Sequence, residues 1–279
     1  MHKNTQEEHS QHSGLHLNPQ HEYHLVDASP WPVLTSISLF YLTLSGVALF
    51  HFFTRGPSML CLAIAVLVPI LACWWRDVVR EGTFNLHHTI RVQIGLRYGM
   101  ILFIISEVLF FFAFFRTFFH SSLAPTHAIG CVWPPAAICV FSPFQVPLLN
   151  TCLLLTSGAT ITLAHYNLLV GNRIWTIEAL KSTVSLAVLF TLLQAYEYLE
   201  APFSIADGIY ASTFYVATGF HGLHVMIGTL FILIGFERFR ANHFTYRNHF
   251  GFEAAARHWH FVDVIWLIPY ISIYYWGNL

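Results

Sequence analysis

The stretch "ILFIISEVLFFFAFF", from Ile101 to Phe115, decides the fold class because it is almost unbroken hydrophobic sequence around one carboxylate, Glu107. With its flanks it is long enough to cross the hydrocarbon core of a bilayer as an α-helix. A carboxylate at the centre of such a helix costs about 2.5 to 3.5 kcal/mol on insertion scales. Glu107 is therefore either protonated and hydrogen-bonded to a neighbouring helix, or ionised against a buried partner or water. One interpretation of Glu107 is structural: a protonated carboxyl group that joins two helices by a hydrogen bond. The functional interpretation is a proton-linked or lipid-linked site.

The composition of the whole chain supports a membrane protein. Charged residues make up 10% of its 279 residues, against about 25% in ordinary soluble domains, and phenylalanine occurs 26 times. The mean hydropathy is +0.57. A net charge of −1 excludes the large basic field typical of nucleic-acid binding. The five cysteines are scattered without a CxxC pair, which argues against a disulfide framework or a zinc knuckle.

Seven apolar stretches each have about the length that a bilayer core requires, and the backbone must then be helical because lipid cannot satisfy its hydrogen bonds. Transmembrane strands would instead alternate polar and apolar residues. The sequence therefore predicts an all-α polytopic membrane protein with seven transmembrane helices, the second and fifth being the shortest. The predicted spans are residues 33–53, 59–75, 98–119, 146–170, 183–199, 210–236 and 260–276.

The distribution of lysine and arginine predicts the orientation of these spans. With seven spans, the N-terminus and the loops after the second, fourth and sixth lie on one side, which is the side of synthesis, cytoplasm or mitochondrial matrix. The C-terminus lies on the other side, with only Arg55 and Arg116. The first side holds the remaining cations, which are Lys3, Arg76, Arg80, Arg91, Arg97, Arg173, Lys181, Arg238, Arg240, Arg247 and Arg257.

The N-terminal extension, residues 1–22, is polar and rich in histidine. It has no apolar core of a secretory signal, and it lacks the arginines of a transit peptide. We expect a disordered polar tail ahead of a seven-helix domain formed by residues 23–279.

The segment "WWRDVVREGTFNLHHT", Trp74 to Thr89, combines an aromatic pair with arginines and histidines at the end of the second span. Tryptophan is enriched at membrane interfaces, and basic side chains at that level suit the phosphate of anionic lipids. The alternative is topogenic charge with no specific ligand.

Histidines in the last two spans raise the question of a metal. His221 and His224 in "TGFHGLHVMIG" are three residues apart, and "RHWHFVD" adds His258, His260 and Asp263. A metal site needs three or four converging ligands, and a di-iron site needs Glu-x-x-His pairs that no span carries. We therefore favour histidine as an interhelical hydrogen-bonding residue among closely packed helices.

Several long motifs resemble the cytochrome c oxidase subunit III family, in order from about Tyr23 to the C-terminus. The motifs are "YHLVDASPWP", "WWRDVVREGTFNLHH", "GLRYGMILFIISEVLFFFAFF", "HSSLAP", "PLLNT", "YLEAPFSIADGIYASTFYVATGFHGLHVMIGTLF" and "HFGFEAAA…WHFVDVIW". The resemblance implies a core subunit of the terminal respiratory oxidase. Helices 1–2 and 3–7 would form two bundles around a V-shaped cleft that holds phospholipid.

The same resemblance implies that this chain carries no catalytic residue, no metal and no cofactor other than bound phospholipid. Haem a, haem a3 and copper would belong to partner subunits I and II, with further accessory subunits in the complex and no nucleic acid. The chain would support proton uptake into subunit I and the stability of the enzyme during turnover. It would lie in the mitochondrial inner membrane, N-terminus in the matrix and C-terminus in the intermembrane space, with a bacterial plasma membrane as the alternative.

At the residue level, Glu107 matches the family's carbodiimide-reactive intramembrane glutamate. The resemblance implies lipid binding by Trp75, Arg80, Glu81, His88 and Arg238.

The chain also departs from the family pattern. Arg257 and His258 stand where many members have an aromatic pair, and Arg116 stands where animal members have an apolar residue. An arginine at the membrane edge can reach lipid phosphate with its flexible stem. Pro269 lies inside the seventh span, where a kink is expected.

Two other classes of function remain as alternatives. A proton-coupled carrier could use Glu107 and the span-six histidines, but it would usually show broken helices in matching halves. A membrane metalloenzyme would need more converging ligands than the spans provide.

Overall fold

The computed structural model describes residues 21–246 and 248–278, so nearly all of the predicted N-terminal extension, residues 1–22, lies outside the described residues. The described part is all-helical, as predicted, and contains no strand. Two 3₁₀ turns (His127–Ile129 and Trp276–Asn278) and one π-helix (Tyr270–Tyr275) accompany the long helices. The long helices are α1 (Trp31–Phe50), α2 (Gly56–Thr83), α3 (Ile90–Leu123), α4 (Val146–Val170), α5 (Arg173–Leu199), α6 (Ile209–Arg240) and α7 (Phe250–Pro269).

Six of these helices, α1 to α6, are long and apolar enough to cross a membrane. The twenty residues of α7 include Glu253, Arg257 and Asp263, and the seventh predicted span continues from α7 into the π-helix Tyr270–Tyr275. This change of helix type follows Pro269, whose missing N–H removes one α-helical hydrogen bond. The chain is a polytopic helical membrane protein.

Two helices extend well beyond the apolar stretches that predicted them, whereas α4 has the bounds predicted for the fourth span. The second and fifth are 28 and 27 residues long, although the sequence suggested only 59–75 and 183–199. The end of a helix is set by its caps rather than by the edge of the apolar run. At the start of α5, for example, the Asn172 side chain accepts a hydrogen bond from the backbone N–H of Trp175.

The chain divides into two compact units, residues 1–95 and 96–279. The described first unit holds α1 and α2, and the second holds most of α3 together with α4 to α7. This grouping agrees with the expected sets of helices 1–2 and 3–7. The lipid-holding cleft stays a prediction.

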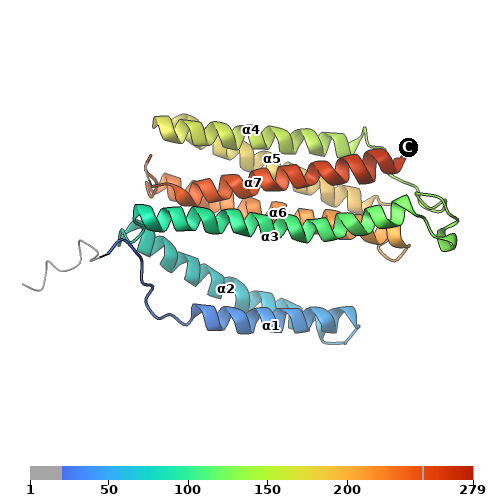
Figure 1. Ribbon diagram of the computed structural model, residues 1–279, viewed down its shortest axis with the longest axis horizontal. Helices are drawn as coiled ribbons and strands as arrows, with labels where there is room; N and C mark the ends of the chain where they lie inside the picture. Colours follow the sequence, from blue (N-terminus) through green and yellow to red (C-terminus); the bar gives the residue numbers. More distant parts are fainter. Residues whose placement is uncertain (1–20, 247, 279) are drawn as a thin grey trace, which may run out of the picture. The chain divides into compact units, whose positions relative to one another are not determined.

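In the first unit, α1 and α2 pack against each other as a helical hairpin (Figure 1). Small residues are fully buried in it, including Ser45 and Ala63, and they let the two backbones approach closely. The Ser45 hydroxyl donates to backbone carbonyls of its own helix, so its burial leaves no unmet donor. The indole N–H of Trp31 donates to Asp77 Oδ2 at 2.7 Å and ties the start of α1 to the end of α2.

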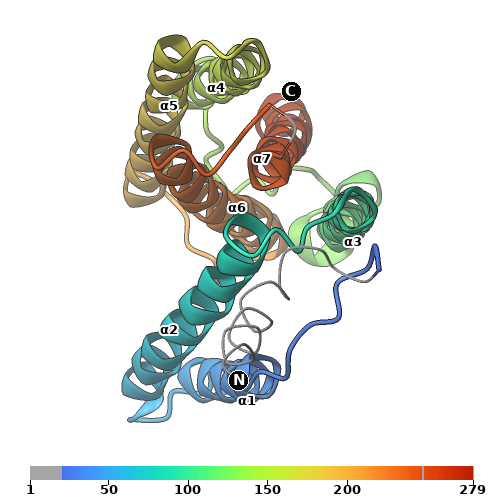
Figure 2. The same cartoon turned by 90° about the vertical axis from the view of Figure 1, so that its left-hand side faces the viewer.

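In the second unit, α7 packs against α4 and α6, and α5 packs against α4 and α6 (Figure 2). Trp259 and Trp266, two turns apart on α7, are fully buried. Their indole N–H groups donate to Ser157 Oγ at 2.9 Å and to Thr151 Oγ1 at 3.0 Å, both on α4. Each buried indole therefore combines a large apolar contact with a satisfied polar group.

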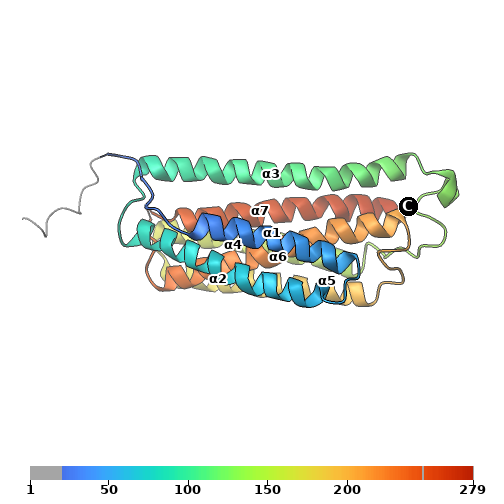
Figure 3. The same ribbon diagram turned by 90° about the horizontal axis from the view of Figure 1, so that it is seen from below.

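The long helix α3 runs beside the rest of the second unit (Figure 3) and meets α6 and α7 through large side chains. The rings of Phe110 and Phe220 lie 5.0 Å apart, and those of Phe111 and Phe261 lie 6.1 Å apart. These aromatic contacts place Glu107, one turn away on α3, against α6.

Candidate functional site

Glu107 lies near the middle of α3 and contacts a neighbouring helix. Its Oε2 atom is 2.7 Å from Nε2 of His224 on α6, and the two side chains are only 22% and 12% exposed. The ring of Phe111 stands edge-on to the His224 ring at 5.0 Å. Of the partners considered for this carboxylate, the structure therefore shows a side chain of another helix.

The other ring nitrogen of His224 determines the charge of this pair. Its Nδ1 atom lies 2.6 Å from the backbone oxygen of Phe220, which can only accept, so Nδ1 carries a proton. One further proton then lies between His224 Nε2 and Glu107 Oε2. With that proton on Glu107 both groups are neutral, and with it on His224 the two charges cancel. In either form the pair has no net charge, which limits the cost of placing a carboxylate in the membrane.

The two histidines of α6 do not converge on one ligand. His221 is fully buried, with Nε2 3.2 Å from the backbone oxygen of Val262 and its ring 4.9 Å from that of Trp266. His258 of α7 contacts the other histidine of this pair: its ring stacks against that of His224 at 6.2 Å. Within residues 21–246 and 248–278, no group of three or more histidine, cysteine, aspartate or glutamate side chains is placed to hold a metal ion.

The end of α2 presents two of the predicted lipid-binding residues to the surroundings. Trp75 is 59% exposed, and the side chain of Arg80 is 61% exposed with Nη1 3.9 Å from Asp77 Oδ1. Asp77 also accepts from Trp31 and contacts Arg76 at 2.9 Å, so it organises this end of the hairpin. The local sequence did not indicate this role of Asp77, which lies within the segment Trp74 to Thr89.

The other two predicted residues of the first unit, Glu81 and His88, gather around His24. His24 Nε2 lies 3.9 Å from Glu81 Oε2, and the His24 and His88 rings are 6.2 Å apart. A Cβ atom at Gly82 would lie 2.6 Å from His88 Nδ1, so only glycine lets His88 pack so closely on α2. The clustering of His24 with Glu81 was not expected, because the two residues are far apart in sequence.

Arg238, the fifth predicted lipid-binding residue, lies in the last turn of α6 in the second unit. Its guanidinium carbon is 4.4 Å from the centre of the Phe244 ring, a cation–π distance. A Cβ atom at Gly251 would lie 2.5 Å from Arg238 Nη1, so the absence of a side chain there makes room for the guanidinium.

A cluster around Glu253 joins α3 to α7 and was not predicted. Arg97 donates to both carboxylate oxygens at 3.0 Å, and His249 Nε2 and Arg257 Nη2 each lie 3.3 Å from the carboxylate. Burial alone would raise the pKa of Glu253, but the Arg97 hydrogen bonds and the neighbouring charges outweigh it and lower that pKa below its ordinary value. The motif "HFGFEAAA" contained this residue, but nothing local indicated its partner.

Together these features define a class: a polytopic helical membrane protein with an intramembrane carboxyl group paired with a histidine, and with arginine and histidine clusters at the ends of its helices. Comparison with known proteins identifies the particular family. The family model described as cytochrome c oxidase subunit III matches residues 21–278. The chain belongs to this family.

Curated relatives support the assignment over nearly the whole chain. A cytochrome c oxidase subunit 3 from Prototheca wickerhamii is 57% identical, covering 93% of this chain and 99% of the relative. The subunit 3 from Marchantia polymorpha is 54% identical and covers 95% of this chain and 100% of the relative. The one from Ceratotherium simum is 58% identical and covers 92% of this chain and 98% of the relative. The chain is thus a non-catalytic subunit of an oxidoreductase, the terminal respiratory oxidase, and it works in a complex with other subunits. None of these comparisons supports the carrier alternative.

Proposed function

We propose that this chain binds phospholipid beside subunits I and II of the oxidase, in the mitochondrial inner membrane, and thereby supports proton uptake and a long working lifetime of the enzyme. Haem a, haem a3 and copper would lie in the partner subunits. The observation that carries the lipid part of the proposal is the polar end of α2, where Trp75 and Arg80 are exposed and where Glu81 and His88 gather around His24.

The chemistry of this end of α2 suits a lipid headgroup. An exposed tryptophan favours the level of the headgroups, and an exposed guanidinium there can donate two parallel hydrogen bonds to a phosphate. In the second unit, Arg238 ends α6 at a position where a cation is expected on the same side of the membrane. The excess of arginine and lysine on that side supports insertion from the matrix, with the C-terminus in the intermembrane space.

Glu107 supports the proposal through its neutrality rather than through a fixed charge. Because the pair with His224 shares one proton, it can hold a carboxyl group in the membrane without a counter-ion from another subunit. We propose that this carboxyl group is the carbodiimide-reactive one, and that it tunes the packing of α3 on α6 next to the lipid.

The experiment that tests the proposal is purification through this chain in mild detergent, followed by a reduced-minus-oxidised spectrum and a phospholipid assay. We expect haem a bands and retained phospholipid, both lost together when harsher detergent strips the chain from the complex. A second sample, with Arg80→Met, should keep the haem bands and lose phospholipid. Full retention of phospholipid by the stripped oxidase would contradict the lipid role, and a colourless preparation would contradict the proposed partners.

A further inference from the structure

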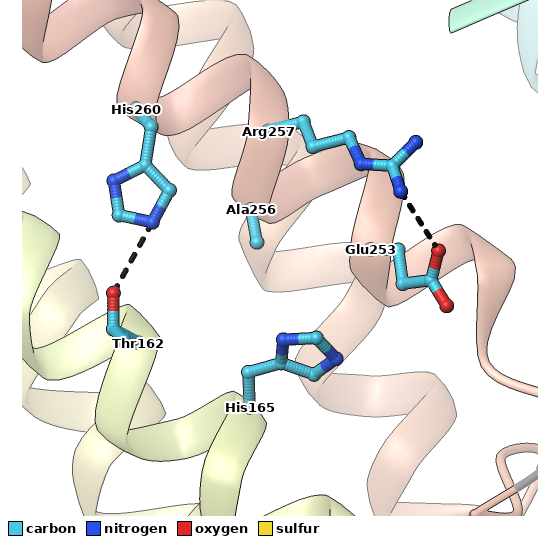
Figure 4. Close-up of a pocket in the computed structure, with 6 residues that line it drawn as sticks. All are labelled: Thr162, His165, Glu253, Ala256, Arg257 and His260. Atoms are coloured by element: carbon cyan, nitrogen blue, oxygen red, sulfur yellow. Dashed lines mark hydrogen bonds and ion pairs between the residues drawn. The ribbon is translucent and has the colours of Figure 1, made fainter. Parts of the chain in front are cut away.

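A cavity of about 180 Å³ lies between α4 and α7 in the second unit, apart from all the predicted lipid-binding residues (Figure 4). Thr162 and His165 reach it from α4, and the other lining residues come from α7. Its walls are formed by Thr162, His165, Glu253, Ala256, Arg257 and His260.

The charged cluster around Glu253 at one side of this cavity is positive, and a second carboxylate, Asp263, lies 4.0 Å from the wall residue His260. Two guanidinium groups, those of Arg97 and Arg257, face the single carboxylate of Glu253. Because Arg97 already takes both carboxylate oxygens, Glu253 compensates only one of the two cations. The cluster of two guanidinium groups and one carboxylate therefore carries a net positive charge, although both guanidinium groups contact Glu253.

Two hydrogen-bonding atoms at this cavity also lack partners among the residues that the structure describes. They are Nη1 of Arg257 and Nε2 of His165, both enclosed. In contrast, Thr162 donates to the backbone oxygen of Gly158 and lies 3.2 Å from His260 Nε2, so these two wall residues satisfy each other. Enclosed polar atoms in native proteins are nearly always hydrogen-bonded, so Nη1 of Arg257, which can only donate, indicates an acceptor that comes from outside the chain. His165 can donate to the same acceptor in the tautomer that carries its proton on Nε2.

The depth of the cavity matches lipid headgroups. Arg257 is seven residues from the start of α7, or about 10 Å along the helix axis. His165 is five residues from the end of α4, at the same end of the unit. The headgroup regions add about 5 to 8 Å on each side of the hydrocarbon core, and a guanidinium can extend further along its stem.

Beyond the cavity, toward the start of α4 and the end of α7, the same faces of the two helices become apolar. Leu155 lies two turns from Thr162 on α4, and Val264 lies one turn from His260 on α7. Their side chains are 50% and 59% exposed. A cationic pocket at headgroup depth followed by an exposed apolar strip is complementary to an anionic amphiphile.

We propose that the groove between α4 and α7 binds one anionic phospholipid, with its phosphate held by Arg257 and His165 and its acyl chains along Leu155 and Val264. A zwitterionic lipid fits less well, because its ammonium group would be repelled by Arg257. The site depends on Arg257, which stands at a position where the sequence pattern suggested an aromatic residue. It goes beyond the proposed function, whose lipid-binding residues lie on α2, at His88 after α2, and near the end of α6.

The test uses the assembled oxidase in mild detergent, with phosphatidylglycerol added stepwise and bound lipids counted by native mass spectrometry. Arg257→Met keeps the length of the side chain and removes its charge, so we expect one phosphatidylglycerol to bind about tenfold more weakly. Phosphatidylcholine binding should not change. The matched control is Arg240→Met, which removes an exposed guanidinium paired with Glu237 elsewhere in the unit and should have no effect.

Two further variants test the charge at Arg257 and the contact at His165 separately. Arg257→Lys should restore part of the preference for phosphatidylglycerol, and His165→Phe should weaken binding while keeping a ring against Phe252. His165→Phe decides the matter if haem spectra show that Arg257→Met does not assemble. Unchanged phosphatidylglycerol binding in the assembled variant overturns the proposal. So does displacement of the lipid by inorganic phosphate, which would identify a soluble anion as the occupant. Lipid loss in Arg80→Met alone would leave the proposed function standing and overturn only this site.

Discussion

At the scale of single residues, the central feature is the proton shared by Glu107 and His224. The hydrogen bond from Nδ1 of His224 to a backbone oxygen leaves only Nε2 to face the carboxyl group. A carboxylate that would be costly alone is thereby held in a pair without net charge. The structure thus gives a physical reason for a carboxyl group among the phenylalanines of α3.

We expect the shared proton to reside mainly on Glu107, because separated charges are disfavoured at low dielectric constant. Infrared difference spectra of the oxidase should then show a protonated carboxyl band that disappears in Glu107→Gln. The absence of a protonated carboxyl band that depends on Glu107 would contradict this prediction.

The partner of Glu107 can be removed separately. His224→Phe leaves the carboxyl group without its hydrogen bond, and we expect a loss of about 1 to 3 kcal/mol in stability. Glu107→Gln should cost less, because an amide can still donate to His224 Nε2. Thermal inactivation of the two variants compares these costs, with Ser106→Ala, which only removes a hydroxyl bonded to its own helix, as the control. Equal losses in both variants would show that the pair contributes nothing specific.

At the scale of elements, the Arg97–Glu253 pair ties α3 to α7 near one end of the second unit. The folded-state pKa of Glu253 is lowered, so its contribution is present above the ordinary pKa of about 4.5 and is lost as the pH falls through the lower folded-state value. We expect the stability of the subunit to fall with acidification in that window, and Glu253→Gln to reduce this dependence. Denaturation midpoints measured across the acid range give this pH dependence of stability. If the midpoint changes equally with pH in the unmodified protein and in Glu253→Gln, the pair has no role.

The elements also show how far sequence reasoning reaches. The seven helices were predicted from apolar runs, because hydrophobic length is a local property of the chain. The end of α2 and the start of α5 were not, since α2 continues past its apolar residues and α5 begins before its own, at the Asn172 cap. The spacing of His221 and His224 raised the question of a metal, yet their hydrogen-bonding partners differ: His221 Nε2 lies against Val262 of α7, and His224 Nε2 lies against Glu107 of α3. Side chains three residues apart on an α-helix point in directions different enough for each to meet a different neighbouring helix.

At the scale of the whole molecule, the proposed lipid role depends on cations in both units. We expect Arg238→Ala to reduce the phospholipid that co-purifies with the oxidase and to shorten its working lifetime during turnover. The control is Lys181→Ala, which removes an exposed cation paired with Glu178. Lipid content and lifetime that remain at the level of the unmodified enzyme would contradict a lipid-holding role for Arg238.

The sequence by itself determined the class of the protein, the number of its helices, the need of Glu107 for a partner and the family to which the chain belongs. These depend on composition, apolar length and long motifs, which are all read along the chain. Only the tertiary structure decided that the partner is His224, that Arg97 clamps Glu253, and that Arg257 and His165 border one cavity. Those contacts join residues about 90 to 160 positions apart, and no local pattern records which helix faces meet when the bundle packs.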